Sequence, residues 1–147
     1  MQIQLNFKEK PKWADILIGS IKKGLTKSSI VIVNNLKDRT DIVGVSGDLR
    51  KSNRYEIKEE QKEIFSRIYN TKEYAPFVEF DTRPHWPPIS ALKDWCRLKL
   101  GDEGLAFVIA RNISKKGTKG KHFFRDALYN NQDKAKEIII AEIRKVL

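Results

Sequence analysis

The feature that most restricts the fold of this chain is the stretch YAPFVEFDTRPHWPP, Tyr74–Pro88, in which four of fifteen residues are prolines. Proline cannot donate a backbone hydrogen bond, and it restricts the conformation of the residue before it. Neither a long helix nor a central strand can run through such a segment. The alternating apolar residues of its first half predict a strand, and Pro84, Pro87 and Pro88 predict a rigid exit that aims a following helix.

The chain before these prolines is expected to form one helix and then β structure. A helix is predicted from Lys12 to about Leu36, because apolar residues recur at three- and four-residue spacings, namely Trp13, Ile16, Leu17, Ile21 and Leu25. Residues 37–53 are polar, contain two glycines and predict a loop that could be mobile. Residues 54–59 and 63–70 predict a β-hairpin with the polar EEQK at its tip. Residues 75–81 predict a third strand, which would complete a small antiparallel meander.

The chain after the prolines is expected to be helical. Ser90 is a favourable N-cap for a segment ending at Gly101, with Leu92, Trp95 and Cys96 on one face. Asp102 can cap a second segment, which Gly117 would end. A charged C-terminal helix follows, with an interruption expected at Asn130–Asn131. The chain thus predicts one α+β domain over residues 1–147: an N-terminal helix, a β-meander, helices packed on one face, and a C-terminal helix.

The charge of the chain favours polyanionic partners. Lysine and arginine number 29 against 19 acidic residues, a net charge of +10. Six Lys/Arg and no acid lie between Arg111 and Arg125, in a segment that also contains Phe123 and Phe124. This mixture is compatible with sequence-independent contact to phosphates. The two phenylalanines open a helix and are expected to anchor the core, and no RRM, zinc-finger or KH signature is present.

Other features exclude several classes of protein. No apolar run approaches the length of a membrane span, and the first residues do not resemble a secretory signal. Cys96 is the only cysteine, so no intrachain disulfide can form, and a reducing intracellular site of synthesis is expected.

A catalytic or metal site would have to use the few clustered ionisable groups. Glu79, Asp81 and His85 form a loose set of two carboxylates and an imidazole, but their spacing matches no zinc signature. The only other histidine, His122, lies among lysines in a different segment. There is no GxSxG, Walker or GxGxxG motif. We expect these three side chains to be solvated charges at the end of a strand, and a metal-dependent nuclease that uses them is a distant alternative. We therefore expect that the protein is not an enzyme and has no cofactor.

Three short motifs in a fixed order carry a resemblance to a known family. They are GDLRKS (Gly47–Ser52), the YAPFVEFDT of Tyr74–Thr82, and a basic loop followed by FFRDAL (Phe123–Leu128). This order resembles the tailed-phage minor structural proteins described as tail components or neck proteins. Members of that family have a small–Gly–x–Leu–Arg–x–Ser element, then Tyr-Ala-x-x-Val-Glu-Phe-Gly-Thr, then Phe-Phe-Arg-Pro-Ala-Leu. Asp81 replaces the glycine and Asp126 the proline, and both changes keep the local geometry feasible.

The resemblance implies a non-catalytic subunit of the phage connector, made in the host cytoplasm and carried in the virion. Such subunits form rings around the channel through which DNA leaves, and contact neighbouring connector and tail proteins. The residues expected to touch DNA are Lys115, Lys116, Lys119, Lys121 and Arg125. Those expected at subunit interfaces are Arg50, Glu79, Asp81, Arg83, His85 and Trp86. The alternative from another class is a stand-alone, sequence-independent nucleic-acid-binding protein of a mobile element.

Overall fold

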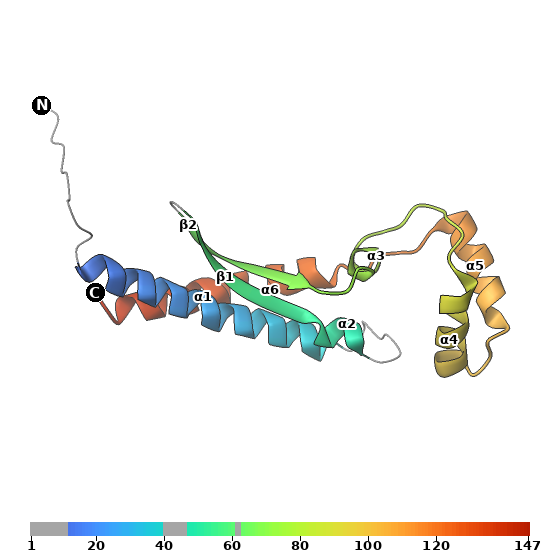
Figure 1. The fold of residues 1–147 in the computed structure, drawn as a ribbon, viewed down its shortest axis with the longest axis horizontal. Helices are drawn as coiled ribbons and strands as arrows, with labels where there is room; N and C mark the ends of the chain where they lie inside the picture. Colours follow the sequence, from blue (N-terminus) through green and yellow to red (C-terminus); the bar gives the residue numbers. More distant parts are fainter. Residues whose placement is uncertain (1–11, 40–46, 61–62) are drawn as a thin grey trace, which may run out of the picture.

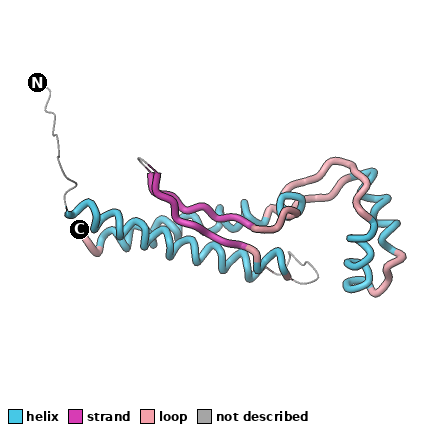
Figure 2. Tube along the Cα trace, viewed as in Figure 1, coloured by secondary structure: helices cyan, strands magenta, loops and turns pink. Residues whose placement is uncertain are grey.

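A computed structural model describes residues 12–39, 47–60 and 63–147, and shows an elongated α+β protein (Figure 1). The elements, in chain order, are α1 (Lys12–Asp38), α2 (Asp48–Lys51), β1 (Asn53–Glu60), β2 (Glu63–Asn70), α3 (Ala75–Glu79), α4 (Ile89–Leu100), α5 (Leu105–Lys116) and α6 (Phe123–Arg144). The predicted fold class is confirmed. The long helices α1 and α6 and the two strands make one body, and α4 and α5 form a helical hairpin that stands at one end of it (Figure 2).

Helices α1 and α6 lie side by side and run in opposite directions along the body (Figure 1). The face of α1 that is buried consists largely of small residues, including Ser20, Gly24, Ser28 and Ser29. A Cβ atom at Gly24 would lie only 2.8 Å from the Cα atom of Ile139 in α6. The backbones therefore approach closely at this point. The serine hydroxyls bond within their own helix, as in the 2.6 Å bond from Ser29 Oγ to the Leu25 carbonyl.

The predicted apolar face of α1 is wrong in its first turns. Trp13 is 65% exposed and Ile16 56% exposed, whereas Leu17, Ile21 and Leu25 are half-buried beside the small-residue face. The helix itself runs through the β-prone residues 30–33 as predicted.

The sheet consists of two antiparallel strands rather than the predicted three. Their register runs from Asn53 opposite Asn70 to Glu60 opposite Glu63, and both strands pack against α1. The residues expected to form a third strand are instead α3 and the extended segment after it. Pro76 lies in the first turn of α3, where the missing N–H is not needed by the helix.

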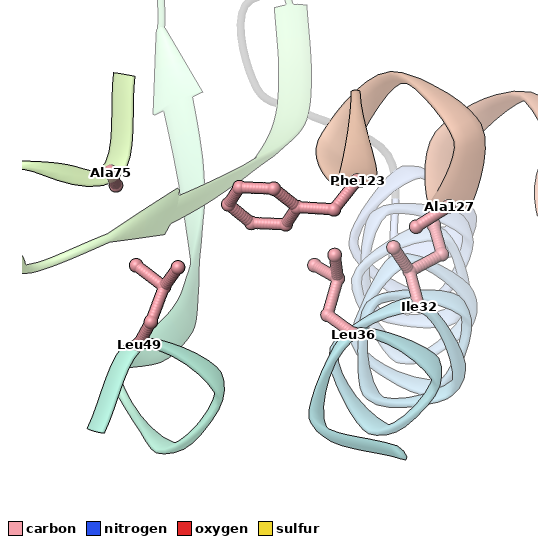
Figure 3. Packing of buried hydrophobic residues seen from close by; sticks show 6 residues of the cluster. All are labelled: Ile32, Leu36, Leu49, Ala75, Phe123 and Ala127. Carbon is pink, nitrogen blue, oxygen red and sulfur yellow. The ribbon is translucent and has the colours of Figure 1, made fainter. Parts of the chain in front are cut away.

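The core lies where four helices, α1, α2, α3 and α6, meet. Ile32 and Leu36 of α1, Leu49 of α2, Ala75 of α3, and Phe123 and Ala127 of α6 form one buried cluster (Figure 3). The ring of Phe123 is fully buried and points between α1 and β2, in agreement with its expected role as an anchor.

Three predicted helix boundaries need correction. Ser90 lies inside α4, whose N-cap position is Pro88. Asp102 lies in the loop before α5, where its Oδ1 accepts a 2.8 Å hydrogen bond from the Gly104 N–H, and α5 begins only at Leu105. Helix α6 is continuous through Asn130–Asn131, because Asn131 is buried and its Nδ2 donates to the Ala127 carbonyl at 2.8 Å.

The predicted helix ends at Gly101 and Gly117 are confirmed, and the predicted loop before the sheet is partly helical. Gly101 and Gly117 end α4 and α5 with positive φ angles of 74° and 71°, as predicted. Part of the predicted loop at 37–53 is helical, because α1 extends to Asp38 and α2 spans Asp48–Lys51. Residues 40–46 of that loop lie outside the described residues. Within the described ranges, no helix is both long and apolar enough to cross a membrane.

Candidate functional site

Two segments connect the body to the helical hairpin, and they run side by side (Figure 2). One contains the prolines after α3, and the other is the basic loop between α5 and α6. The Thr82 N–H donates to the Thr118 carbonyl at 2.9 Å, the Thr118 N–H donates to Thr82 Oγ1 at 2.9 Å, and the two hydroxyl oxygens lie 2.8 Å apart. The Lys121 N–H donates to the Val78 carbonyl at 2.7 Å. The proline stretch is therefore one half of a paired connection.

Both glycines of the basic loop are required by this pairing. A Cβ atom at Gly117 would lie 1.9 Å from the Thr82 carbonyl oxygen, and one at Gly120 would lie 2.5 Å from the Glu79 carbonyl oxygen. Only a residue without a side chain permits backbones to approach so closely. The GTKG sequence is thus explained by packing between the two segments.

The acidic residues of the proline stretch hold this connection in place. Glu79 is only 6% exposed. Its Oε2 accepts a 2.8 Å hydrogen bond from the Phe124 N–H, and its Oε1 a 3.1 Å bond from the Arg125 N–H, so it caps α6. Asp81 Oδ1 accepts a 2.7 Å bond from the Gly120 N–H. A carboxylate at a helix N-terminus is favoured by both the free N–H groups and the helix dipole.

These contacts define what Glu79, Asp81 and His85 do. Glu79 is a buried cap within the chain rather than an exposed contact residue. His85 is exposed, and its Nδ1 lies 2.9 Å from the Arg83 carbonyl oxygen. Throughout the described part of the chain, no three His, Cys, Asp or Glu side chains gather so that they could hold a metal ion. The geometry of this set is that of a structural connection.

The other residues predicted at interfaces lie in different places. Arg83 and Trp86 are exposed on the proline segment, and the Trp86 ring packs edge-on against Phe107 of α5, with centroids 5.8 Å apart. Arg50 lies on α2, apart from that segment. It is half-buried, and its Nη1 donates to the Arg39 carbonyl at 3.2 Å.

The five basic residues predicted to contact DNA are all exposed. Arg125 forms a 3.0 Å ion pair with Asp126. Among the described residues, no acidic side chain forms an ion pair with Lys115, Lys116, Lys119 or Lys121. The first two of these lysines lie in the last turn of α5, whereas the other two lie in the loop and line a hollow described next.

An apolar notch lies in the angle between α3 and the helical hairpin. It has a volume of about 700 Å³. Its walls are the aromatic and aliphatic side chains of α3, the prolines before α4, and one face of the hairpin, and its rim carries Lys119 and Lys121. Phe77 on one wall is 65% exposed and Leu98 on the other is 59% exposed. Phe107 and Val108 of α5 do not line the notch and are 56% and 54% exposed.

These apolar surfaces were missed by the sequence reasoning. The sequence pattern predicts a strand at Phe77, and Leu98 is not among the residues of the predicted apolar face, which are Leu92, Trp95 and Cys96. The signal available in the sequence was the number of large apolar side chains in the two short helices, which is more than the contact between the two helices can cover.

Comparison of this chain with protein-family models, with curated proteins and with solved structures found no match in any of the three.

Proposed function

We propose that this chain is a non-catalytic structural subunit of a phage or prophage head–tail connector or tail-completion complex, which assembles as a ring around the DNA channel in the virion. The observation that carries the proposal is the uncovered apolar surface of the helical hairpin and the notch beside it. Phe77, Leu98, Phe107 and Val108 are each more than half exposed. Phe77 and Leu98 line the same notch, and an exposed apolar surface of this kind is typical of a site of association.

The fold gives the three family-like motifs a common structural purpose. Leu49 comes from the first motif, Ala75 from the second, and Phe123 and Ala127 from the third, and all four pack in one core cluster. Glu79 of the second motif caps the helix that the third motif opens. The three motifs are distant in sequence but adjacent in space, as expected if together they specify one fold. This arrangement supports the resemblance to phage neck proteins.

The basic residues suit contact with genomic DNA in the channel. Lys115 and Lys116 are exposed in the last turn of α5. Lysines of this kind contact phosphates without reading the base sequence. In the proposed ring the remaining partners are copies of the same chain and the adjacent connector and tail proteins.

The proposal is tested by the mass of the purified chain and by its binding to virion parts. Size-exclusion chromatography with light scattering at high concentration is expected to show ring-sized oligomers, and the chain is expected to bind purified tails or connectors. A monomer at every concentration that binds neither would refute the proposal.

The unpaired lysines favour one alternative, a stand-alone nucleic-acid-binding protein of a mobile element. A monomer that binds DNA tightly, with an affinity that falls steeply as salt rises, and that ignores virion parts would support this alternative. Fluorescence anisotropy with a DNA duplex of random sequence, measured at low and high salt, separates the two functions.

A further inference from the structure

The tip of the helical hairpin is a turn that exposes both acidic and apolar side chains. It consists of residues 100–105, with Leu100 and Leu105 exposed on either side of Asp102 and Glu103, which are also exposed. Gly101 ends α4 with a φ of 74°, and Asp102 Oδ1 accepts the 2.8 Å bond from the Gly104 N–H, so the turn has a defined shape. Neither acid of the tip forms an ion pair within the described residues.

The notch has the complementary character. Its walls are apolar, with Tyr74, Phe77 and Trp95 among them, and Lys119 and Lys121 stand at its rim. The rim lysines belong to the segment between Arg111 and Arg125, which contains no acid. Asp94 also lines the notch, but its carboxylate is paired with Arg97 at 2.8 Å. The notch can therefore accept a chain turn that brings both apolar side chains and negative charge.

The tip cannot reach the rim of its own notch. Helix α4 has 12 residues, so it places about 18 Å between the tip and the prolines at the other end of the hairpin. The tip is the free end of the hairpin, and the basic loop lies at its attached end (Figure 1). Only a second molecule can bring the two surfaces together.

We propose that the hairpin tip of one copy docks in the notch of the next copy, with Asp102 and Glu103 facing Lys119 and Lys121. This inference rests on the proposed function and specifies which surfaces the subunits use. Contact of tip with tip, or of notch rim with notch rim, would bring like charges together, so the charges favour contact of a tip with a notch. A head-to-tail contact repeats from copy to copy and closes into a ring when the rotation permits.

The docking also divides the basic residues by role. Lys119 and Lys121 line the notch and bind the tip of the neighbour, whereas Lys115 and Lys116 do not line it and remain available to phosphates. The two pairs of lysines lie within seven residues of one another and differ in what they face, so they form a matched set for an experiment.

The experiment uses charge reversal in the full chain. One variant is Asp102→Asn/Glu103→Lys, in which asparagine keeps the acceptor for the Gly104 N–H. The second is Lys119→Glu/Lys121→Glu, and the control is Lys115→Glu/Lys116→Glu. Sedimentation at equal protein concentration is expected to show that each of the first two variants loses at least about tenfold in assembly affinity. The control is expected to assemble like the wild type and to lose DNA affinity.

Mixing the first two variants gives the decisive measurement. The basic tip of the first variant can dock in the acidic notch of the second. The tip of the second variant and the notch of the first keep their wild-type charges and can also dock. An equimolar mixture is therefore expected to assemble again. If the wild type assembles and the tip and notch variants assemble equally well, the docking proposal is overturned while the proposed function stands. Equal loss in the Lys115→Glu/Lys116→Glu control also overturns it, since general charge would then be the cause. If the wild type is a monomer and binds phage tails through Lys119 and Lys121, the notch binds another protein and the docking proposal is overturned. If the wild type is a monomer and binds no virion part, the proposed function itself is refuted.

Discussion

Glu79 and Phe124 are 45 residues apart in the chain and are joined by a 2.8 Å hydrogen bond from the Phe124 N–H to Glu79 Oε2. The other carboxylate oxygen accepts the Arg125 N–H, and the Glu79 carbonyl accepts the His122 N–H at 3.0 Å. Residue 79 thus satisfies three N–H groups at the start of α6. One buried side chain fixes the first turn of the C-terminal helix to α3 and to the connection that carries the helical hairpin.

Replacing this cap should destabilise the whole body. We expect Glu79→Ala to lower the free energy of unfolding by about 1–2 kcal/mol, because two N–H groups at the helix start lose their acceptor. Glu79→Gln keeps one amide oxygen as an acceptor and should lose less. Urea denaturation followed by circular dichroism measures both. Glu73→Ala is the control, because Glu73 is an exposed acid on the same segment. Equal losses at the two positions would contradict the role of Glu79 as a cap.

The parts of the fold that follow from local patterns could be predicted from the sequence. Tyr55 and Ile57 alternate with charged residues in β1, β2 is rich in β-prone apolar residues, and Gly101 and Gly117 mark helix ends that require a positive φ. Helix α3 could not be predicted in this way, because the alternation of Phe77, Val78 and Phe80 resembles a strand. What decides its conformation is pairing with residues about 40 positions later, as in the bond from the Lys121 N–H to the Val78 carbonyl.

The buried face of α1 escaped prediction for a different reason. Apolar periodicity counts large side chains, and it selected a stripe that includes the exposed Trp13 and Ile16. The close approach of α6 instead buries Gly24 and several serines, whose hydroxyls are satisfied by their own helix. In the candidate site, Glu79 and Asp81 were noticed because of their charge, but their partners are backbone N–H groups, which no side-chain pattern reveals.

The paired connection should be sensitive to a side chain at Gly117. We expect Gly117→Ala to raise amide hydrogen exchange at Thr82 and Thr118 by about a hundredfold, because the new Cβ atom would lie 1.9 Å from the Thr82 carbonyl oxygen and separate the two segments. Gly101→Ala is the matched control. Its φ is also positive, at 74°, but nothing lies within 4 Å of the added atom. That variant carries only the strain of the backbone conformation, about 1–2 kcal/mol, and should leave exchange at Thr82 unchanged.

The contact between α1 and α6 should be equally specific. We expect Gly24→Ala to destabilise the protein by about 1–3 kcal/mol, because its Cβ atom would lie 2.8 Å from Ile139 Cα and force the helices apart. Gly19→Ala in the same helix has open space around the added atom, and alanine is the better helix former. It should stabilise the protein by about 0.5–1 kcal/mol. Thermal unfolding of the two variants compares them directly, and shifts of the same sign would contradict the close packing.

Glu142 should make the pairing of α1 with α6 sensitive to acid. Its Oε1 lies 2.7 Å from Lys27 Nζ of α1 and 2.5 Å from Lys145 Nζ. Hydrogen bonds from Lys145 and from Lys27 lower the pKa of Glu142 from 4.5 to about 2. The pKa of Glu142 is lower in the folded state than in the unfolded state. The stabilisation that its ion pairs contribute is therefore fully present above the unfolded-state pKa near 4.5, and it is lost as the pH falls toward 2.

Denaturation between pH 6 and pH 2 is expected to show a smaller acid-induced loss of stability for Glu142→Gln than for the wild type. The control is Glu137→Gln, since Glu137 is an exposed acid of the same helix that forms no ion pair with a described residue. If Glu142→Gln kept the full acid dependence of the wild type, the bridge between the two helices would not be its source.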